Sequence, residues 1–397
     1  MMSKKYDYLA KAVPVAPLKL VGLPGCEKLT GKINDYLVTN RKKLVHEYPE
    51  KRKIRGLCEE NYIIDCELPR FGTGESKARL LQSARGVDLF ILVDVCNPSV
   101  KYEAFGRETR MSPDDHYQNL KRVISAVTGK AHRINVIMPF LYESRQHRRT
   151  ARESLDCAFS LQELTKMGVS NILTFDAHDP HVMNAIPLSG FDNFFPNYQF
   201  LQALLESEPD LSISKNNLVV ISPDEGAMPR AIYFANILGV DIGMFYKRRD
   251  YSVIVNGKNP IVAHEFIGDS VEGKDCVVID DMISSGGSIL DVAKQLKGRG
   301  AKRVFVCTTF GLFTDGFDEF DKYYKDGMIE KVITTDLIYQ QPELLKKPWY
   351  ATARMEKYLA NIIDTLNHDI STEKVRDNTH KINKLMKKYR RQNSHEG

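Results

Sequence analysis

The chain has 397 residues, which is long enough for two domains that each bury a hydrophobic core. A net charge of +5, with 43% hydrophobic and 27% charged residues, is too small to indicate a nucleic-acid partner. The seven cysteines form no Cys-x-x-Cys pair, and the longest apolar run, LFILVDVC, is too short to cross a bilayer. We therefore expect a cytoplasmic protein with no nucleic-acid or membrane partner.

Short β-branched runs alternate with helical patterns along the chain. Helix-like stretches lie at 153–168 and 287–299. This alternation predicts an α/β fold with largely parallel sheets, whose ligands bind beyond the carboxyl ends of the strands. The runs predicted to be buried strands are 135–140, 171–178, 217–226, 240–249, 276–282, 303–313 and 331–337.

The likeliest domain boundary lies within residues 189–217, where two polar, turn-rich segments occur. The basic stretches at both ends of the chain are predicted to be solvated faces or helical extensions, with specific anion or partner binding as the alternative. The expected organisation is an N-terminal extension (1–60), an N-terminal α/β domain (61–200), a C-terminal α/β domain (201–345), a helix for which packing on the N-terminal domain is one option (346–370), and a basic polar tail (371–397).

The stretch CVVIDDMISSGGSILDVAKQL (276–296) is a candidate ligand site. A buried strand ends at Ile279, two carboxylates follow, and a small-residue loop leads into a helix. Backbone N–H groups at a helix N-terminus can bind a phosphate, and the carboxylates of Asp280 and Asp281 can accept hydrogen bonds from sugar hydroxyls. The pattern therefore indicates a sugar phosphate, and leaves open whether that ligand acts as donor or acceptor.

Six motifs, which follow the family's order along the chain, together resemble the ribose-phosphate pyrophosphokinase family over residues 65–365. The motif VVIDDMISSGGSI by itself also resembles the phosphoribosyltransferases, and the other five motifs distinguish the two families. The motifs are VVIDDMISSGGSI (277–289), RFGTGES (70–76), YESRQHRR (142–149), TFDAHDPHV (174–182), VVISPDEGAMPRA (219–231) and YKRRD (246–250).

The resemblance implies a fold and an activity. The fold would be two similar type I phosphoribosyltransferase-like domains, each a mainly parallel sheet flanked by helices. The chain would be an enzyme of nucleotide biosynthesis, a ribose-phosphate diphosphokinase, which transfers the β,γ-diphosphoryl group of MgATP to O1 of ribose 5-phosphate and releases AMP. A catalytically silent regulatory subunit and a phosphoribosyltransferase are the alternatives.

The resemblance also implies roles for cationic residues. Lys247 and Arg249 would stabilise the transition state, and as residues two apart on a predicted strand they are expected to share a face. Arg145 and Gln146 would bind ATP. They are the first two residues of an arginine-rich segment (145–152), which is expected to act as a mobile lid over the nucleotide.

Two loops are implied to bind the substrates. In the nucleotide loop, Phe71–Glu75, the family pattern assigns ATP binding to Phe71, Thr73, Gly74 and Glu75. In such enzymes this loop reaches a neighbouring subunit's site, so the resemblance implies a homo-oligomer built from dimers, with a hexamer as one option, and an ATP site at a subunit interface. The residues implied to bind ribose phosphate are Asp280, Asp281 and the members of the ribose-phosphate loop, Ser284, Ser285, Gly286, Gly287 and Ser288.

The implied cofactor is Mg²⁺, with His178, Asp224 and Asp176 as candidate ligands. An H-x-x-H pair, His178 and His181, lacks the further ligands that zinc requires. The sequence departs from the common family pattern at Ser284, where many members have an aspartate, and at His147, where an aspartate follows Arg-Gln.

Overall fold

The computed structural model describes residue 9 and residues 11–249 and 261–393, without the side chains of residues 247–249, 261–264 and 390–393. The chain divides into two compact units. Unit 1 is Met1–Phe195, Leu337–Tyr339 and Met355–Asp377, and unit 2 is Pro196–Asp336, Gln340–Arg354 and Asn378–Gly397.

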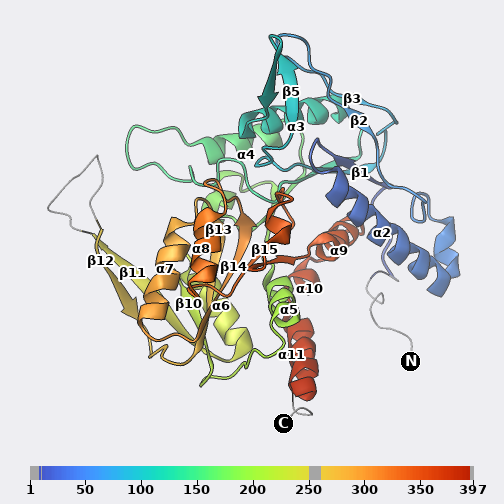
Figure 1. Ribbon diagram of the computed structural model, residues 1–397. Coiled ribbons are helices and arrows are strands. Elements are labelled where there is room, and N and C mark those ends of the chain that lie inside the picture. The colour runs from blue at the N-terminus through green and yellow to red at the C-terminus, as the bar shows by residue number, and fades with distance from the viewer. Residues whose placement is uncertain (1–8, 10, 250–260, 394–397) are drawn as a thin grey trace. The chain divides into compact units, whose positions relative to one another are not determined.

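Unit 1 is built on a five-stranded parallel sheet in the order β1-β4-β7-β8-β9 (Figure 1). Its central strands are short and buried, as expected for a parallel sheet covered on both faces. The strands are β1 (Leu18–Gly22), β4 (Asp88–Leu92), β7 (Arg133–Ile137), β8 (Asn171–Phe175) and β9 (Gly190–Phe194).

Helices and two small antiparallel pairs complete unit 1. The segment 1–60, which we expected to be an extension, supplies β1 to the sheet and α2, and the helix expected within 346–370 is α9. The helices are α2 (Glu27–Glu47), η1 (Pro49–Lys53), α3 (Pro113–Val127), α4 (Asp156–Lys166), η2 (Pro180–Ala185), α9 (Glu356–Asn367) and α10 (Glu373–Arg376). The small pairs are β2 (Cys66–Glu67) with β3 (Arg79–Leu80), and β5 (Lys101–Ala104) with β6 (Arg107–Arg110).

A buried polar network joins α2 to α9 within unit 1. Arg41 Nε and Nη2 donate to Asp364 Oδ1 at 2.9 and 2.8 Å, and Arg41 Nη2 also donates to Asn367 Oδ1 at 2.6 Å. Burial raises the pKa of Asp364, but the charges of Arg41 and His368 and the hydrogen bonds from both side chains together lower it to about 2. Because a buried ion pair is costly to break, this network fixes α9 on α2.

Unit 2 contains a seven-stranded sheet in the order β12-β11-β10-β13-β14-β15-β16, parallel except where β12 pairs with β11. The predicted α/β fold with mainly parallel sheets is confirmed. The strands are β10 (Leu218–Ser222), β11 (Asp241–Arg249), β12 (Ile261–Ile267), β13 (Asp275–Ile283), β14 (Arg303–Gly311), β15 (Lys331–Thr335) and β16 (Tyr350–Ala353).

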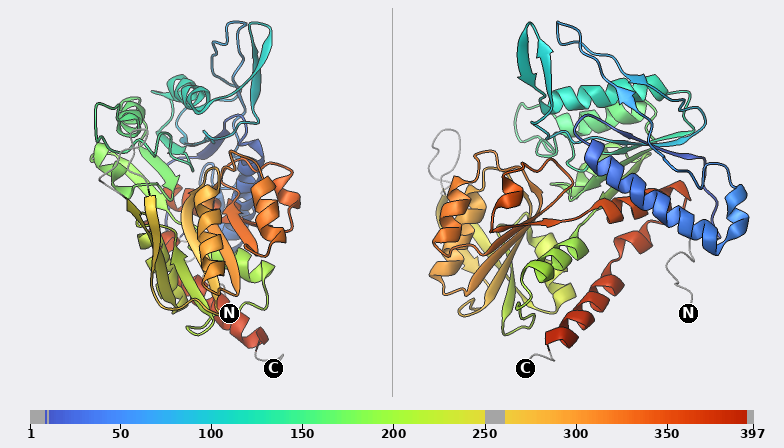
Figure 2. Two further views of the ribbon diagram at one scale, coloured as in Figure 1. Left: turned by 60° about the vertical axis from the view of Figure 1, so that its left-hand side comes forward. Right: turned by 45° about the vertical axis from the view of Figure 1, so that its right-hand side comes forward.

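Helices cover both faces of the sheet of unit 2 (Figure 2), and alternate residues of its central strands pack in two separate cores. Val277 and Ile279 of β13 pack with α5 (Asn197–Ser207), α6 (Met228–Leu238) and α11 (Thr379–Asn393). Cys276 and Val278 pack instead with α7 (Gly287–Gly298) and α8 (Asp318–Lys325). The period of two that side chains follow along a strand places helices on both faces. One short helix, η3 (Leu344–Lys346), precedes β16.

The segment 371–397 is not solely a solvated tail within its described part. On α11, Ile382, Met386 and Tyr389 are buried in the core of unit 2. The Tyr389 hydroxyl donates to the Pro209 carbonyl at 2.7 Å. The spacing of these residues by four and three positions forms the apolar stripe of an amphipathic helix, whose other face is basic.

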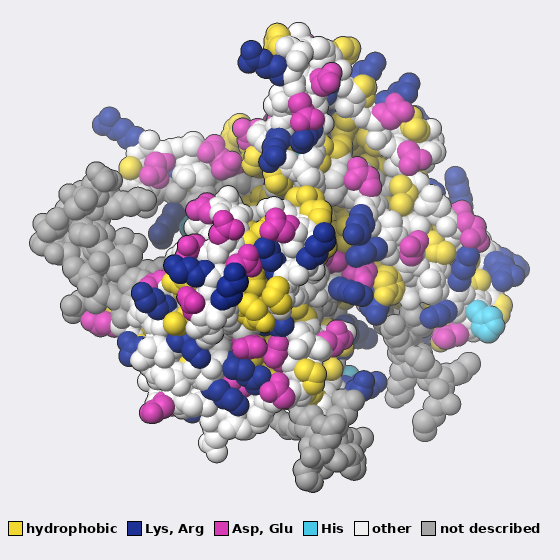
Figure 3. All heavy atoms as spheres, viewed as in Figure 1, with side chains coloured by type: hydrophobic (Ala, Val, Ile, Leu, Met, Phe, Trp, Pro, Cys, Tyr) yellow, Lys and Arg dark blue, Asp and Glu magenta, His cyan; other side chains and the backbone are white. Residues whose placement is uncertain are grey.

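No helix within the described residues is both long and apolar enough to span a membrane. On the face drawn in Figure 3, basic and acidic side chains are interspersed. The modest net charge of +5 is therefore not gathered into one continuous area on that face.

Candidate active site

The ribose-phosphate loop lies between the end of β13 and the start of α7 in unit 2. Gly286 has a φ of +99°, and a Cβ atom there would lie 2.5 and 2.6 Å from ring atoms of Phe320. Only glycine fits a left-handed conformation this close to an aromatic ring. Gly286 therefore sets the turn that carries the chain from strand to helix.

The start of α7 has open backbone donors. The first N–H groups of an α-helix have no partner within the helix, and no side chain caps α7. Ser285, Gly287 and Ser288 are exposed. Small side chains and exposed N–H groups at a helix N-terminus suit the binding of a phosphate.

Two predicted carboxylates precede this loop, and a third lies near them. Burial, and then the neighbouring charges of Asp281 and Asp224, raise the pKa of Asp280 well above its ordinary value. Arg230 is a described cation near these carboxylates, and its Nη2 lies 3.9 Å from Asp281 Oδ2. The end of β13 therefore carries excess negative charge, which fits sugar hydroxyls and a divalent cation.

The predicted catalytic residues Lys247 and Arg249 both lie on β11, which pairs with the antiparallel edge strand β12. The pairing register shifts between Arg248 and Arg249. Their side chains lie outside the described residues, so the expectation that they share one face stays a prediction.

In unit 1, the nucleotide loop is a tight turn between β2 and β3. The Phe71 N–H donates to the Glu75 carbonyl, and the Gly74 N–H donates to the Phe71 carbonyl, both at 2.8 Å. The Thr73 hydroxyl donates to Glu75 Oε2 at 2.9 Å. Phe71 is 53% exposed. A large aromatic side chain presented at the surface by a hydrogen-bonded turn is suited to stacking on a base.

Arg145 is exposed, and Gln146 is held by the chain around it. The Gln146 side chain donates to the Ser154 carbonyl at 2.7 Å, and its backbone N–H donates to the Glu143 carbonyl at 2.8 Å. The arginine-rich segment therefore folds back on itself through Gln146 while Arg145 extends to solvent.

The predicted metal residues of unit 1 follow β8. Asp176 is buried with a φ of +42°, whereas His178 is exposed. The His147 ring lies with its centroid 5.5 Å from that of His178, and His147 Nε2 lies 3.5 Å from Asp179 Oδ2. The structure thus brings the arginine-rich segment against the metal segment through His147.

Asp179 was not among the predicted site residues. Burial raises its pKa, but hydrogen bonds from the His181 N–H and ring, and the charge of His147, leave that pKa below its ordinary value. The motif TFDAHDPHV contains Asp179, but nothing in the sequence indicates that His147 lies beside it. Arg230 was missed for the same reason, since only folding places it near Asp281.

The residues present fit a magnesium ion. Across the part of the chain that the structure describes, no group of three His, Cys, Asp or Glu side chains could hold a metal. Magnesium, however, commonly takes one or two protein ligands together with water and phosphate oxygens. The exposed imidazole of His178 in unit 1 and the partly exposed carboxylate of Asp224 in unit 2 are each accessible as one such ligand, with a polyphosphate supplying further oxygens.

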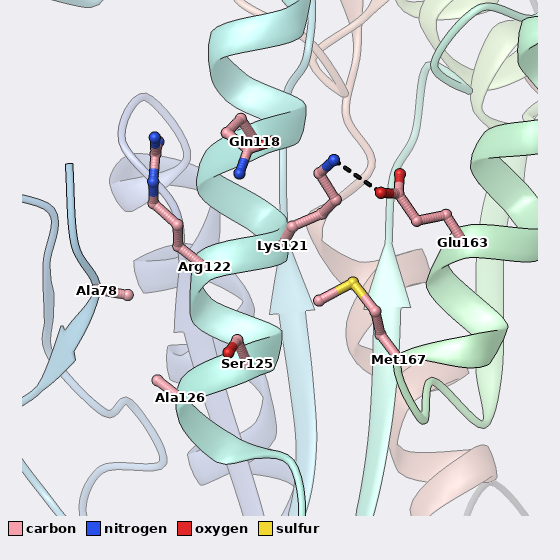
Figure 4. Close-up of a pocket in the computed structure, with 8 residues that line it drawn as sticks. All are labelled: Ala78, Gln118, Lys121, Arg122, Ser125, Ala126, Glu163 and Met167. Carbon is pink, nitrogen blue, oxygen red and sulfur yellow. Dashed lines mark hydrogen bonds and ion pairs between the residues drawn. The ribbon is translucent and has the colours of Figure 1, made fainter. Parts of the chain in front are cut away.

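A separate hollow of about 520 Å³ lies along α3 and α4 (Figure 4). Its cations already have partners: Lys121 pairs with Glu163 at 2.9 Å, and Arg122 donates to Asn119 at 2.9 Å. None of the predicted site residues lines it. The predicted site residues of each unit therefore lie outside this hollow.

Two family models match the chain. Residues 18–168 match the N-terminal domain of ribose phosphate pyrophosphokinase, and residues 200–347 match the phosphoribosyl transferase domain. The ribose-phosphate pyrophosphokinase of Vibrio parahaemolyticus is 30% identical over 311 residues, which are 77% of this chain and 89% of that protein. The enzyme of that name from Pasteurella multocida is 30% identical over 284 residues, 70% of this chain and 81% of that protein.

A solved structure shows the same fold. The crystal structure of phosphoribosylpyrophosphate synthetase from Mycobacterium smegmatis superposes with a TM-score of 0.68 at 21% identity, covering 89% of this chain and 99% of that chain. The sequence relatives cover most of both chains, and the two matched domains correspond to the sheets of units 1 and 2. The chain therefore belongs to the ribose-phosphate pyrophosphokinase family.

Proposed function

We propose that this chain is an active ribose-phosphate diphosphokinase, with MgATP as the diphosphoryl donor and ribose 5-phosphate as the acceptor. The observation that carries the proposal is the succession in unit 2 of the half-buried Asp280, the buried Asp281, a glycine turn and a helix N-terminus that no described side chain caps. Family membership supplies the donor, because the nucleotide loop and the arginine-rich segment match motifs of the synthetases.

The acceptor binds at the end of β13. The N–H groups of the ribose-phosphate loop hold the 5-phosphate, and hydroxyls of the ribose donate hydrogen bonds to Asp280 and Asp281. Burial and the neighbouring carboxylates of Asp281 and Asp224 raise the pKa of Asp280. The ribose hydroxyls then donate the hydrogen bonds that water would otherwise donate to these carboxylates.

The donor uses the elements of unit 1. Phe71 stacks on the adenine base, Thr73, Gly74 and Glu75 hold the turn and offer polar groups, and Arg145 and Gln146 contact the nucleotide. The exposure of Phe71 and Arg145 supports this assignment, since neither side chain is buried against the rest of unit 1.

In the reaction, O1 of ribose 5-phosphate attacks the β-phosphorus of ATP. A new O–P bond forms at O1, the bond between the α,β-bridging oxygen and the β-phosphorus breaks, AMP leaves, and the proton of the O1 hydroxyl passes to solvent. Transfer of this kind depends on positioning and on neutralising charge, which is the role we assign to Lys247 and Arg249.

The candidate ligands for Mg²⁺ are His178 and Asp176 in unit 1, the latter binding directly or through water, and Asp224 in unit 2. When bound, the ion neutralises charge on the phosphate oxygens. We further propose that the chain works in the cytoplasm as a homo-oligomer built from dimers, in which the nucleotide loop of one subunit completes a neighbour's ATP site.

The test is product formation by the purified chain. With Mg²⁺, ATP and ribose 5-phosphate, AMP and phosphoribosyl pyrophosphate should form in equal amounts, and neither should form without ribose 5-phosphate. Lys247→Ala should reduce the rate by roughly 100-fold or more, as removal of one stabilising charge does. Lys294→Ala, which removes an exposed cation from α7, is the charge-matched control and should keep the wild-type rate.

Two results would overturn the proposal. A chain that forms no AMP but changes the rate of a separate active synthetase would be a regulatory subunit. A chain that consumes phosphoribosyl pyrophosphate in the presence of a purine or pyrimidine base, and forms none, would be a phosphoribosyltransferase.

A further inference from the structure

The nucleotide loop has little structure of its own to hold it in place. It lies between strands of two residues each, and its internal hydrogen bonds only close the turn. A loop that must present Phe71 to a base needs support from outside, because ordering a free loop on binding would weaken affinity.

Arg70 supplies part of that support from beneath the loop. Its Nη1 donates to the Gly74 carbonyl at 2.8 Å and lies 3.5 Å from Asp115 Oδ1, and the Arg70 side chain is only 9% exposed. Among the described residues, Arg70 Nε and Nη2 are buried with no hydrogen-bond partner. This cation therefore depends on another favourable contact.

That contact comes from the β5–β6 hairpin. The guanidinium carbon of Arg70 lies 4.2 Å from the centre of the Tyr102 ring, a cation–π distance. The Tyr102 hydroxyl points to Asp115, 3.4 Å away, at the capped N-terminus of α3. Tyr102 thus connects the guanidinium beneath the loop to a rigid helix.

The tip of the hairpin makes a second contact with the nucleotide loop (Figure 1). The Phe105 N–H donates to the Gly72 carbonyl at 2.7 Å. Phe105 is 80% exposed and has a φ of +51°, in a two-residue turn with Gly106. A bulky residue rarely adopts this conformation, and here the strained turn aims its N–H at the loop.

We infer that the hairpin Lys101–Arg110 is a positioning element for the nucleotide loop, with Tyr102 and Arg70 as its positioning residues. The hairpin holds the loop in its binding conformation before ATP arrives, so it determines affinity for ATP and leaves the handling of ribose 5-phosphate unchanged. This inference rests on the proposed function, because it assumes that the loop binds the nucleotide.

The test compares two substitutions of Tyr102 in the full-length chain. Tyr102→Leu removes the aromatic ring, and Tyr102→Phe keeps the ring and removes the hydroxyl. Lys101→Met is the matched control, because Lys101 lies on the same hairpin and, among the described residues, forms its ion pair with Glu108 across it. The probe is α,β-methylene-ATP, in which a methylene group replaces the oxygen of the bond that would break, and binding is measured by calorimetry.

We expect Tyr102→Leu to weaken binding of this analogue by about tenfold, the effect of losing a partly buried cation–π contact. Tyr102→Phe should change it by less than about threefold, and Lys101→Met should not change it. In steady state, Tyr102→Leu should raise KM for ATP while kcat and KM for ribose 5-phosphate stay at wild-type values. Melting temperatures of all variants establish that each is folded.

Equal affinity of the wild type and Tyr102→Leu for the analogue would overturn this inference alone. A parallel rise in both KM values would also overturn it, because a general loss of structure does not distinguish the two substrates. A wild-type chain that binds no analogue would overturn the proposed function, and this inference with it.

Discussion

The nucleotide loop and the ribose-phosphate loop share a glycine turn but differ in the residues that pack against that turn. Each turns on a glycine in the left-handed region, with φ +90° at Gly74 and +99° at Gly286. A Cβ atom at Gly286 would lie 2.5 Å from the Phe320 ring, whereas at Gly74 the nearest atom would be the Ala104 Cβ at 3.4 Å. One loop is fixed by an aromatic core, and the other is held by a hairpin across an open surface.

The difference shows how each loop tolerates change. Phe320 stacks on Trp349 and meets Phe313 edge-on, so the wall behind Gly286 cannot move without disturbing the core of unit 2. The support behind Gly74 consists of a few polar and cation–π contacts, which can adjust. The same substitution should therefore have unequal effects in the two loops.

The largest effect is expected for Gly286→Ala. Its Cβ would clash with Phe320 and its φ would be strained, so the loop must shift, and a shift of about 1 Å can cost roughly 100-fold in rate. We expect kcat/KM for ribose 5-phosphate to fall by at least that factor. The control is Gly298→Ala on the same helix, where nothing lies within 4 Å of the added Cβ. Near-normal kinetics for Gly286→Ala would contradict the close packing against Phe320.

The second effect separates stability from activity at Asp280. The pKa of Asp280 is raised in the folded protein, so the native state binds the carboxyl proton more tightly than the unfolded state does. Ionisation of Asp280 therefore destabilises the native state as the pH rises above the unfolded pKa of about 4. Asp280→Asn removes that cost, so the variant should melt higher than wild type at pH 8 and nearly equally at pH 4. It should lose roughly 20-fold in kcat/KM for ribose 5-phosphate, as a lost hydrogen bond to a charged group does.

The exposed Asp269→Asn is the control for Asp280→Asn and should leave both melting curves unchanged. If Asp280→Asn melted lower than wild type at pH 8, the negative charge at the end of β13 would be satisfied within the protein, and no cation or sugar would be needed there.

A smaller effect is expected for Phe71→Leu in unit 1. Stacking of an aromatic side chain on a base contributes about 1–3 kcal/mol, so KM for ATP should rise by about tenfold. Phe71 is half-exposed, and the melting temperature should stay within about 1 °C of wild type. Phe71→Tyr keeps the ring and should retain the wild-type KM. An unchanged KM of Phe71→Leu for ATP would show that the adenine base does not stack on Phe71.

The smallest effect is expected for Gly74→Ala. The added Cβ meets Ala104 at an ordinary contact distance, so only the left-handed φ, worth about 1 kcal/mol, opposes the substitution. KM for ATP should rise by about fivefold, and kcat/KM for ribose 5-phosphate should hold. If Gly74→Ala were as harmful as Gly286→Ala, the two loops would be equally constrained and the comparison above would fail.

The parts of the site that could be predicted from sequence are those whose partners are neighbours in the chain. Asp280, Asp281 and Ser284–Ser288 lie close together in the chain, so the order of strand, loop and helix at 276–296 follows from local pattern. The predicted strand end at Ile279 is wrong, because β13 continues to Ile283 and includes both carboxylates. The predicted strands appear with boundaries shifted by a few residues. For β7, the predicted range is 135–140 and the strand is Arg133–Ile137, because the apolar residues 138–140 continue past the last paired one.

The parts that could not be predicted depend on distant pairs. Arg70 and Tyr102 are far apart in sequence, and the β5–β6 turn is formed by Phe105-Gly106 where a two-residue hairpin usually has Asn-Gly. β1 is a short strand that is recognised only by its pairing with β4. The buried stripe on α11 was readable as Ile382, Met386 and Tyr389, but the surrounding lysines and arginines favoured a solvated helix.

The bond between Arg41 and Asp364 has a consequence for synthesis on the ribosome. The two residues are 323 positions apart, so α2 emerges long before its carboxylate partner exists. Until α9 is translated, Arg41 cannot be buried without an unpaired charge, and unit 1 stays incomplete while most of unit 2 is already available to fold. Nascent chains stalled before residue 355 should therefore be cleaved by protease within α2, and chains released at full length should not.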